Sequence, residues 1–594
     1  MNNYFDLHIH PLAKNHLALK PKEPSTKNRL EDLVGPVSMS KDFKDYTNET
    51  VLRKLESQSC IDYLNEGMVR FGVASVSALQ FGMASSKGFF TDILKSGLKK
   101  PIDDQYFEMV KEGKVSYLNL LLKEIQQYID LKEKCDIKYL NRDNTHELNE
   151  SVLNLVFAIG GGHNLCMKKI GNALEYDKFE NFTKGDFYDP STIPSKNPAD
   201  VLESLVDKMR ENKLEVLYLT LAQQTHIPEQ HLATHAFGTK SMKHPSFYPF
   251  GNGLTELGKE VIKRASTLQI EAEDADNKTL TKKKGKSEVV MQSAPVFIDV
   301  TYLSLKSRED LYEFRRKEGF EKIPLIASHV GVTGYSINGW KHNLEVEKCK
   351  NHVDQGIKTI KTYTRPKEAG YWGANDKKGF NFNPNTINLM DEDIIEIANS
   401  GGLIGVSLDV DVLGYDSNFM NEKDNCEFLT TPDFIHFFPY KSIRLLEYAT
   451  AEEIRAQESW LEPNRRELHP LSLCFNIVHI LAVIGLKTSH KDSAEEYICI
   501  GSDFDGFIEP LRVCSDSRNL KNLEACLMKW LPVAAKEYQK VNGGTNDLFE
   551  FTKKKKDLEK VVRKILYING SKFLGDNFSR IISSNEAPNV ELVD

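Results

Sequence analysis

Short apolar runs recur along the chain, and most are followed by a stretch in which apolar residues return every three or four positions. The runs lie at 4–10, 70–81, 153–162, 214–222, 295–304, 323–331, 401–410 and 497–506. Runs this apolar are typical of strands buried on both faces, as in a parallel sheet covered by helices. Amphipathic stretches between them predict crossover helices at 92–100, 197–212, 253–266, 391–400 and 471–486.

Eight alternations of strand and helix predict an α/β protein with a TIM-type (β/α)8 barrel, whose functional residues stand at the carboxyl ends of the strands. A barrel needs roughly 250 residues, whereas this chain has 594. We expect a single domain, 1–594, that carries the excess in long loops able to shape a pocket or a homodimer contact. The predicted insertions are approximately 14–58, 83–150, 271–292, 333–386 and 411–470.

Composition and charge narrow the classes of partner. Charged residues make up 27% of the chain and the net charge is −8, which predicts no nucleic-acid partner. The basic clusters 281–287 and 552–557 stand beside acidic residues, so a solvated loop and a solvated helix face are expected. The nine cysteines form no Cys-x-x-Cys pair, which indicates free thiols. Without a signal sequence or an apolar run of roughly 18 residues, we expect a cytoplasmic protein with no membrane partner.

Candidate chemistry lies at three strand ends. In YFDLHIHP, His8 and His10 are two residues apart and share one face of a strand. Asp503 follows the apolar run YICIG, and His329 ends the run IPLIAS. Each alone has a plainer explanation, since histidines pack in cores and Asp-Gly pairs form turns. Together at one barrel mouth, they predict a site for a divalent ion such as zinc.

These motifs occur in the order of the membrane dipeptidase (renal dipeptidase) family, a metallopeptidase branch of the amidohydrolase superfamily, which the chain resembles. FDLHIH stands where the family has Asp-x-His-x-Asp, AIGGGH where it has Ile-Glu-Gly-Gly-His, and LYLTLAQ where it has Tyr-Leu-Thr-Leu-Thr-His. FIDVTYLS and PLIASHVG resemble two later strands, and IGSDFDG matches the family motif unchanged.

The resemblance implies roles for four residues. His8 and His10 would be metal ligands on the first strand, and His329 would bind a second metal ion. Asp503 would be both a ligand and the base that activates water. The implied activity is hydrolysis of a small amide or dipeptide-like substrate.

Departures from the family pattern fall on the same site. The glutamate that bridges two metal ions is replaced by Gly160, and a strand-five histidine by Tyr302. The substrate-contacting histidine falls on Gln223 and an arginine on Ile387. Because glycine offers no donor atom, we favour one ion over two, with His329 as a further ligand or a hydrogen-bond partner of the bound water. Tyr302, Gln223 and His226 are then the predicted substrate-binding residues.

Two hypotheses follow from these residues. The first is a metal-dependent hydrolase, which the retained His8, His10, His329 and Asp503 favour. The second is a non-catalytic relative that uses the same barrel for binding or interaction, which the changes at Gly160 and Tyr302 favour. The metal content of the purified protein separates them.

Overall fold

The structure is a computed structural model, and its described residues cover the barrel and parts of every insertion. They are 3–18, 33–44, 49–85, 98, 104–111, 115–132, 135–142, 150–165, 197–225, 231–238, 245–272, 290–345, 351–354, 357–372, 378–416, 426–439, 470–544 and 546–578.

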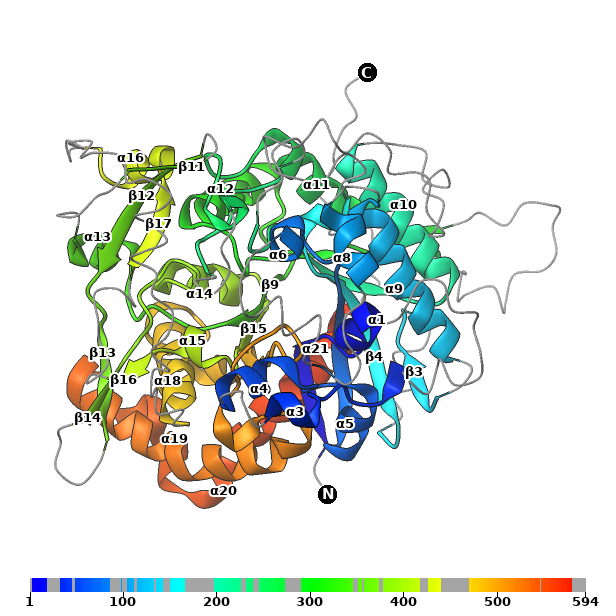
Figure 1. The fold of residues 1–594 in the computed structure, drawn as a ribbon. Helices are drawn as coiled ribbons and strands as arrows, with labels where there is room; N and C mark the ends of the chain where they lie inside the picture. Colours follow the sequence, from blue (N-terminus) through cyan, green and yellow to red (C-terminus); the bar gives the residue numbers. More distant parts are fainter. Residues whose placement is uncertain are drawn as a thin grey trace, which may run out of the picture.

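The centre of the molecule is a nearly closed barrel of parallel strands surrounded by helices (Figure 1). Its strands, in the order in which they neighbour one another, are β1 (Tyr4–Ile9), β2 (Val69–Val76), β4 (Leu153–Ile159), β5 (Val216–Thr220), β8 (Phe297–Asp299), β9 (Leu325–Val330), β15 (Leu403–Val406) and β18 (Ile498–Ile500). All eight match the predicted runs, with β2 beginning one residue earlier, so the TIM-type (β/α)8 barrel is confirmed.

The barrel closes just beyond the ends of its first and last strands. Ile9 pairs in parallel with Phe504. The His10 amide donates to the Phe504 carbonyl, and the Asp503 amide donates to the His8 carbonyl, each at 3.0 Å. The residues that complete the barrel are therefore the predicted metal ligands and their neighbours.

Four of the five predicted crossover helices are present. They are α10 (Pro198–Glu211), α11 (Glu256–Thr267), α14 (Asp391–Asn399) and α18 (Leu471–Lys487). Two begin where a side chain caps the first turn, since Asn197 accepts from the Ala199 amide and Thr255 from the Gly258 amide. The fifth, at 92–100, lies outside the described residues except for Leu98.

The predicted insertions contain secondary structure of their own. Segment 14–58 includes α1 (Ala13–Ala18), α3 (Lys41–Lys44) and α4 (Glu49–Leu55), and segment 83–150 includes α8 (Asp104–Lys111), α9 (Tyr117–Lys132) and β3 (Ile137–Tyr139). Strand β3 pairs in parallel with β4, which adds a ninth strand to the main sheet outside the barrel order. Strands β6 (Gln269–Ala272) and β7 (Val290–Ser293) pair at the ends of segment 271–292, whose residues 273–289 are outside the described part. The division into one domain stays a prediction.

Two small sheets from segments 333–386 and 411–470 lie together on one side of the barrel (Figure 1). The first contains β10 (Leu344–Glu345), β11 (Asn351–Asp354), β12 (Ile357–Thr364) and β17 (Cys426–Thr430), and the second β13 (Glu368–Trp372), β14 (Lys378–Asn381) and β16 (Tyr415–Asp416). Helices α13 (Ile337–Asn343), α15 (Val410–Leu413) and α16 (Thr431–Phe437) belong to the same segments.

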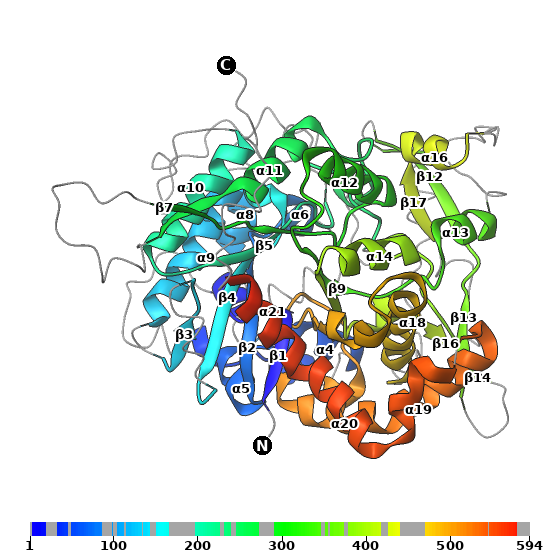
Figure 2. The same ribbon diagram turned by 180° about the vertical axis from the view of Figure 1, so that it is seen from behind.

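The C-terminal helices pack against the first strand. Helices α19 (Leu520–Asn542) and α20 (Lys555–Arg563) lead to α21 (Asn569–Phe578), which lies against β1 in the view from behind (Figure 2). A Cβ at Gly570 would stand 2.1 Å from Phe5 Cδ1, so this close approach requires glycine. Phe5 and Leu7 share a buried cluster with Phe573, which anchors the strand that carries His8 and leads into His10.

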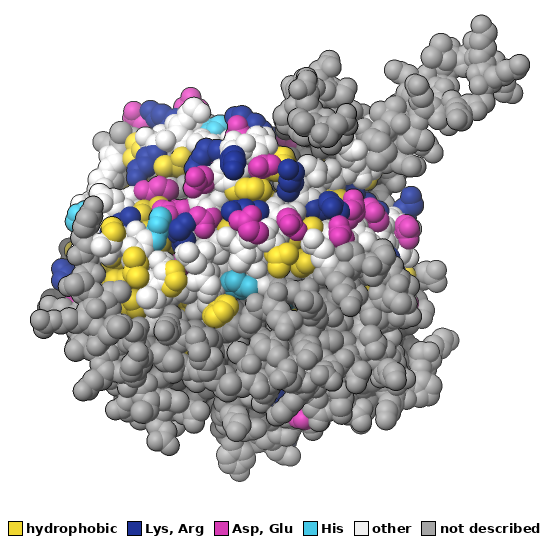
Figure 3. Space-filling view, turned by 90° about the horizontal axis from the view of Figure 1, so that it is seen from above, with side chains coloured by type: hydrophobic (Ala, Val, Ile, Leu, Met, Phe, Trp, Pro, Cys, Tyr) yellow, Lys and Arg dark blue, Asp and Glu magenta, His cyan; other side chains and the backbone are white. Residues whose placement is uncertain are grey.

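The surface seen from above shows acidic and basic side chains interspersed (Figure 3). Helices α11 and α12 (Leu305–Glu318) carry ion pairs there, including Lys259 with Glu256 and Lys263 with Glu318. The basic segment 552–557 is largely exposed, as predicted. All seven cysteines in the described ranges are free thiols. No helix in these ranges is both long and apolar enough to cross a membrane. The expected cytoplasmic location, the homodimer and the absence of a nucleic-acid partner stay predictions.

Buried neutral histidines predict that acid destabilises the fold. Burial lowers the pKa of His16 to about 3 and those of His163 and His235 to about 4. The unfolded chain therefore takes up protons between about pH 6.5 and pH 4 that the folded chain does not, and stability falls as pH falls through this window. With a chelator present, His235→Gln should flatten the slope of unfolding free energy against pH by about 1.4 kcal/mol per pH unit. Urea titrations from pH 7.5 to pH 4.5 measure this slope, and the exposed His342→Gln should keep it unchanged.

Candidate metal centre

Three predicted residues converge at the mouth of the barrel. His8 Nε2 lies 3.1 Å from His10 Nε2, and Asp503 Oδ1 lies 3.7 Å from the first and 3.4 Å from the second. Among the described residues, this is the one group of three or more His, Cys, Asp or Glu side chains close enough to hold a metal ion. His8 is 2% and Asp503 5% exposed, so the cluster is largely shielded from bulk water.

Local backbone geometry brings the carboxylate to the histidines. Asp503 adopts a φ of +60°, a left-handed conformation that aspartate tolerates better than most residues. The chain can turn there because a Cβ at Gly506 would stand 2.2 Å from Asp503 Oδ1. Glycine at 506 therefore makes room for the carboxylate that faces His8 and His10.

Hydrogen bonds determine which nitrogen of each histidine is free. His10 Nδ1 lies 3.0 Å from the Ser75 carbonyl oxygen, which can only accept, so Nδ1 carries the proton. The Tyr218 hydroxyl donates to the Leu7 carbonyl at 3.0 Å and lies 2.7 Å from His8 Nδ1, from which it accepts. In their neutral forms, both imidazoles therefore present a bare Nε2 to the same point. Two lone pairs 3.1 Å apart repel unless a cation stands between them.

The spacing of the three donor atoms fits zinc. Bonds of about 2.0–2.1 Å around a tetrahedral zinc ion separate any two donor atoms by about 3.3 Å. The separations here are 3.1, 3.4 and 3.7 Å. Two imidazoles and one carboxylate with outer hydrogen bonds are also a donor set that zinc accepts. The residues present therefore fit a single divalent ion with one position left open.

The electrostatics of the two histidines differ. Burial, with the charges of His329 and His10, lowers the pKa of His8 well below its usual value. Burial also opposes a charge on His10, but the hydrogen bond and charge of Asp503 outweigh it and raise the pKa of His10. The carboxylate thus attracts a positive charge, either a proton or a metal ion, to the point between the rings.

His329 lies beside the cluster in a different hydrogen-bond network. Its ring centre is 4.0 Å from that of His8, and its Nε2 is 3.9 Å from Asp503 Oδ2. Ser328 Oγ donates to Asp299 Oδ2 at 2.7 Å and accepts from His329 Nδ1 at 2.8 Å. This leaves the lone pair of His329 Nε2 to accept from the Tyr302 hydroxyl at 2.9 Å. The metal-ligand role of His329 stays a prediction.

Tyr302 is held as a neutral hydrogen-bond donor. Burial, with the charge of Asp503, raises its pKa well above the usual value, and its side chain also hydrogen-bonds Gln224. Its backbone has a φ of +65°, which is strained for an aromatic residue. The strain and the two hydrogen bonds direct the hydroxyl to the edge of the cluster.

The remaining predicted positions line the mouth or lie away from the cluster. A Cβ at Gly160 would stand 2.6 Å from Ser75 Oγ and 3.3 Å from Gln223 Nε2, so a larger residue there would require the Ser75 hydroxyl to move. Gln223 is partly exposed beside this glycine. Ile387 lies against Gly238. His226 is outside the described residues.

Sequence reasoning did not single out the residues that orient the ligands. Tyr218 and Ser75 set the histidine tautomers, while Ser328 and Asp299 orient His329. Asp299 is fully buried and accepts hydrogen bonds from Thr220, Thr301 and Ser328. The available signal was polar residues inside otherwise apolar strands, such as Thr220 in LYLT and Asp299 in FID. Each needs a buried partner.

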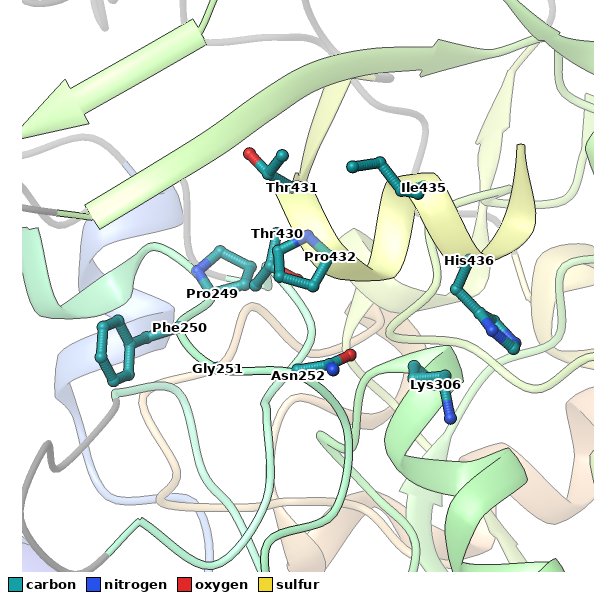
Figure 4. A pocket seen from close by; sticks show the side chains of 10 residues that line it. All are labelled: Pro249, Phe250, Gly251, Asn252, Lys306, Thr430, Thr431, Pro432, Ile435 and His436. Atoms are coloured by element: carbon teal, nitrogen blue, oxygen red, sulfur yellow. The ribbon is translucent and has the colours of Figure 1, made fainter. Parts of the chain in front are cut away.

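An open hollow of about 820 Å³ lies elsewhere on the molecule, between the loop 249–252 and helix α16 (Figure 4). Lys306 at its edge pairs with Asp310, and His436 lies 2.9 Å from Glu309 Oε2. None of the residues of the metal centre lines this hollow, so it adds no group to the chemistry of the cluster.

Comparisons with known proteins give no family assignment. No protein-family model matches the chain, and a search of curated proteins finds no match. Among solved structures, a dipeptidase described as a metallopeptidase of family M19 is 12% identical, covers 98% of this chain and 99% of its own, and has a TM-score of 0.43. A probable dipeptidase from Pseudomonas aeruginosa is 13% identical, with coverages of 97% and 96% and a TM-score of 0.43.

A third solved structure is a metallopeptidase from Rhodobacter sphaeroides bound to a phosphinate mimic of the dipeptide L-Ala-D-Ala. It is 12% identical, covers 96% of this chain and 98% of its own, and has a TM-score of 0.41. Likenesses this distant carry no functional argument, so the function of this chain is inferred from its own residues.

Removing the hydroxyl of Tyr218 should weaken metal binding. Tyr218→Phe leaves His8 Nδ1 without an acceptor, so the ring no longer keeps its Nε2 lone pair directed at the cluster. Loss of such an outer partner typically lowers metal affinity 10- to 100-fold, and we expect a loss in this range. Competition with a chromophoric zinc chelator measures the affinity. Tyr312→Phe removes a hydroxyl bonded to Asp393, distant in the fold, and should bind zinc as tightly as the wild type.

Proposed function

We propose that this protein is a metal-dependent hydrolase that uses one divalent ion, held by His8, His10 and Asp503. The convergence of two bare Nε2 atoms and a carboxylate oxygen supports this proposal most strongly. The donor set favours zinc over harder ions such as magnesium, because two of the three ligands are imidazoles. The proposed substrate is a small amide or a dipeptide-like molecule that enters at the barrel mouth.

The reaction class follows from what the ion and the residues supply. When bound, a zinc ion acts as a Lewis acid that makes water nucleophilic near neutral pH. Asp503 has one oxygen for each task, since Oδ1 faces His8 and His10 while Oδ2 lies on the His329 side. We assign the role of general base to Asp503 Oδ2, which would accept the proton of the attacking water.

Tyr302 and Gln223 are proposed to orient the substrate. The Tyr302 hydroxyl is a neutral donor at the edge of the cluster, so it can turn from His329 Nε2 to a substrate carbonyl oxygen. Gln223 is partly exposed beside Gly160 and offers an amide that both donates and accepts. His226 keeps its predicted substrate-binding role as a proposal.

The residues at positions 160 and 329 favour one ion over two. Gly160 offers no donor atom, and Ser75 fills the space that a larger side chain would need. His329 Nε2, which a second ion would require, accepts from the Tyr302 hydroxyl instead.

The same two positions favour the second candidate, a barrel that binds a partner without catalysis. A non-catalytic barrel would not need two unprotonated imidazole nitrogens beside a buried carboxylate, so this arrangement favours the hydrolase.

Metal content is the deciding measurement. Protein purified after zinc-replete growth should contain about one zinc ion per chain by elemental analysis, and His8→Ala and Asp503→Asn should contain almost none. His8→Ala removes one of three donors, and Asp503→Asn replaces the charged carboxylate by a neutral amide, so neither variant has the donor set that holds a zinc ion. Near-zero zinc in the wild type would contradict the hydrolase and favour the binding protein. About two ions would contradict the single-ion centre.

Tyr302→Phe tests the orienting role. The variant should keep the zinc content of the wild type, because Tyr302 is not a ligand in the proposed centre. Its kcat/KM on the best substrate of a dipeptide and amino-acid amide panel should fall about 100-fold, within the range for loss of one oriented donor. Equal loss of zinc and activity would show that the hydroxyl supports the metal centre and not the substrate. Tyr335→Phe, whose hydroxyl bonds the Arg365 carbonyl, is the matched control.

A further inference from the structure

We propose that Glu124 is a positioning residue of the metal centre, a second carboxylate that compensates the charge of the ion through His10. This inference rests on the proposed function and adds a residue from the insertion 83–150. Glu124 lies on helix α9, which is outside the eight strands that carry the ligands.

The first observation is the position of the carboxylate. Glu124 is 1% exposed. Its Oε2 accepts from the Ser77 amide at 3.1 Å, just beyond the end of β2. Ser77 Oγ in turn donates to the Gly160 carbonyl at 2.8 Å. Glu124 is therefore bound to the end of β2, which Ser77 joins to the end of β4 at the mouth of the barrel.

The second observation is a short path from Glu124 to a ligand. The Ser75 carbonyl, two residues before Ser77, accepts from His10 Nδ1 at 3.0 Å. A shift of the β2 end would therefore move the acceptor that determines the tautomer and the direction of the His10 ring. Outer partners of this kind orient metal-binding histidines and raise their basicity.

The third observation is an uncompensated charge. Glu124 Oε1 is buried without a hydrogen-bond partner, and no cation in the described ranges forms an ion pair with Glu124. A buried carboxylate is costly without a nearby positive charge. The nearby carboxylate of Asp505 differs, because it pairs with Lys14 at 2.8 Å and accepts from the Ser59 amide.

Glu124 and His10 also influence each other directly. Burial raises the pKa of Glu124 to about 7, and the charge of His10 lowers it. A divalent ion with two neutral imidazoles and one carboxylate carries a net charge of +1 in a buried site. The negative charge of Glu124 would make the centre neutral, so the orphan carboxylate and the unbalanced ion stabilise each other.

Two substitutions separate the charge from the hydrogen bond. Glu124→Gln keeps an oxygen that accepts from the Ser77 amide but removes the charge, while Glu124→Ala removes both. We expect about 10-fold weaker zinc binding for Glu124→Gln and a larger loss for Glu124→Ala, in the range reported for outer partners of ligands. Competition with a chromophoric zinc chelator at constant pH measures each affinity.

Thermal unfolding with and without zinc distinguishes charge compensation from a structural role. Above pH 7, where Glu124 is ionised, Glu124→Gln should unfold without zinc at the same temperature as the wild type, or higher, because the uncompensated charge is gone. It should gain less stability when zinc is added. Glu215→Gln is the matched control, since Glu215 is a buried carboxylate that pairs with Arg142 and Arg210 before β5. It should lower the unfolding temperature without changing zinc affinity.

The outcomes separate the inference from the proposed function. If Glu124→Gln binds zinc as tightly as the wild type, the charge of Glu124 has no role at the centre and the inference is wrong. If Glu124→Gln only lowers the unfolding temperature of the metal-free protein, its role is structural and the inference is also wrong. If the wild type binds no zinc, the proposed function itself fails.

Discussion

The seam between β1 and β18 is the constraint on which the rest of the structure depends. Two backbone hydrogen bonds join the strand ends, from the Asp503 amide to the His8 carbonyl and from the His10 amide to the Phe504 carbonyl, each 3.0 Å long. The same residues bring the His8 and His10 imidazoles and the Asp503 carboxylate to one point. Closing the barrel and assembling the candidate metal centre are therefore one event, although about 490 residues separate the two strands. A change that opened the seam would separate the donor atoms.

The neighbouring strands then direct what the seam brings together. Ser75 at the end of β2 and Tyr218 on β5 each hold one Nδ1, so both Nε2 atoms stay bare. Ser328 on β9 links His329 to the buried Asp299 at the end of β8. Each partner comes from a different strand, and parallel strands end at the same edge of a barrel. The orientation of the candidate site is therefore a property of the barrel register and not of any single loop.

Features that depend on residues close together in the sequence could be predicted, whereas contacts between distant segments could not. The eight strands were predictable because burial on both faces leaves a continuous apolar run in the chain itself. His8 and His10 were predictable as a pair because two residues on one strand face need no partner to be recognised. Tyr218 and Ser75 were not, because their role depends on the stagger between strands 65 and more residues apart. Glu124 was hardest, since an insertion helix carries no sign of which strand end it will cover.

The departures from the family pattern at Gly160 and Tyr302 both lie beside the candidate metal centre. They therefore bear on whether the site has lost its catalytic function. Gly160 stands where the resembling family has a glutamate, and Ser75 Oγ lies beside it. Tyr302 stands where that family has a histidine, and its hydroxyl lies 2.9 Å from His329 Nε2. At the Tyr302 position the His329 nitrogen has a hydrogen-bond partner, whereas Ser75 Oγ beside Gly160 is buried without one. The three donors His8, His10 and Asp503 nevertheless lie close together. Under the proposed function, one metal ion takes the place of the proton that otherwise removes the repulsion between the His8 and His10 nitrogens.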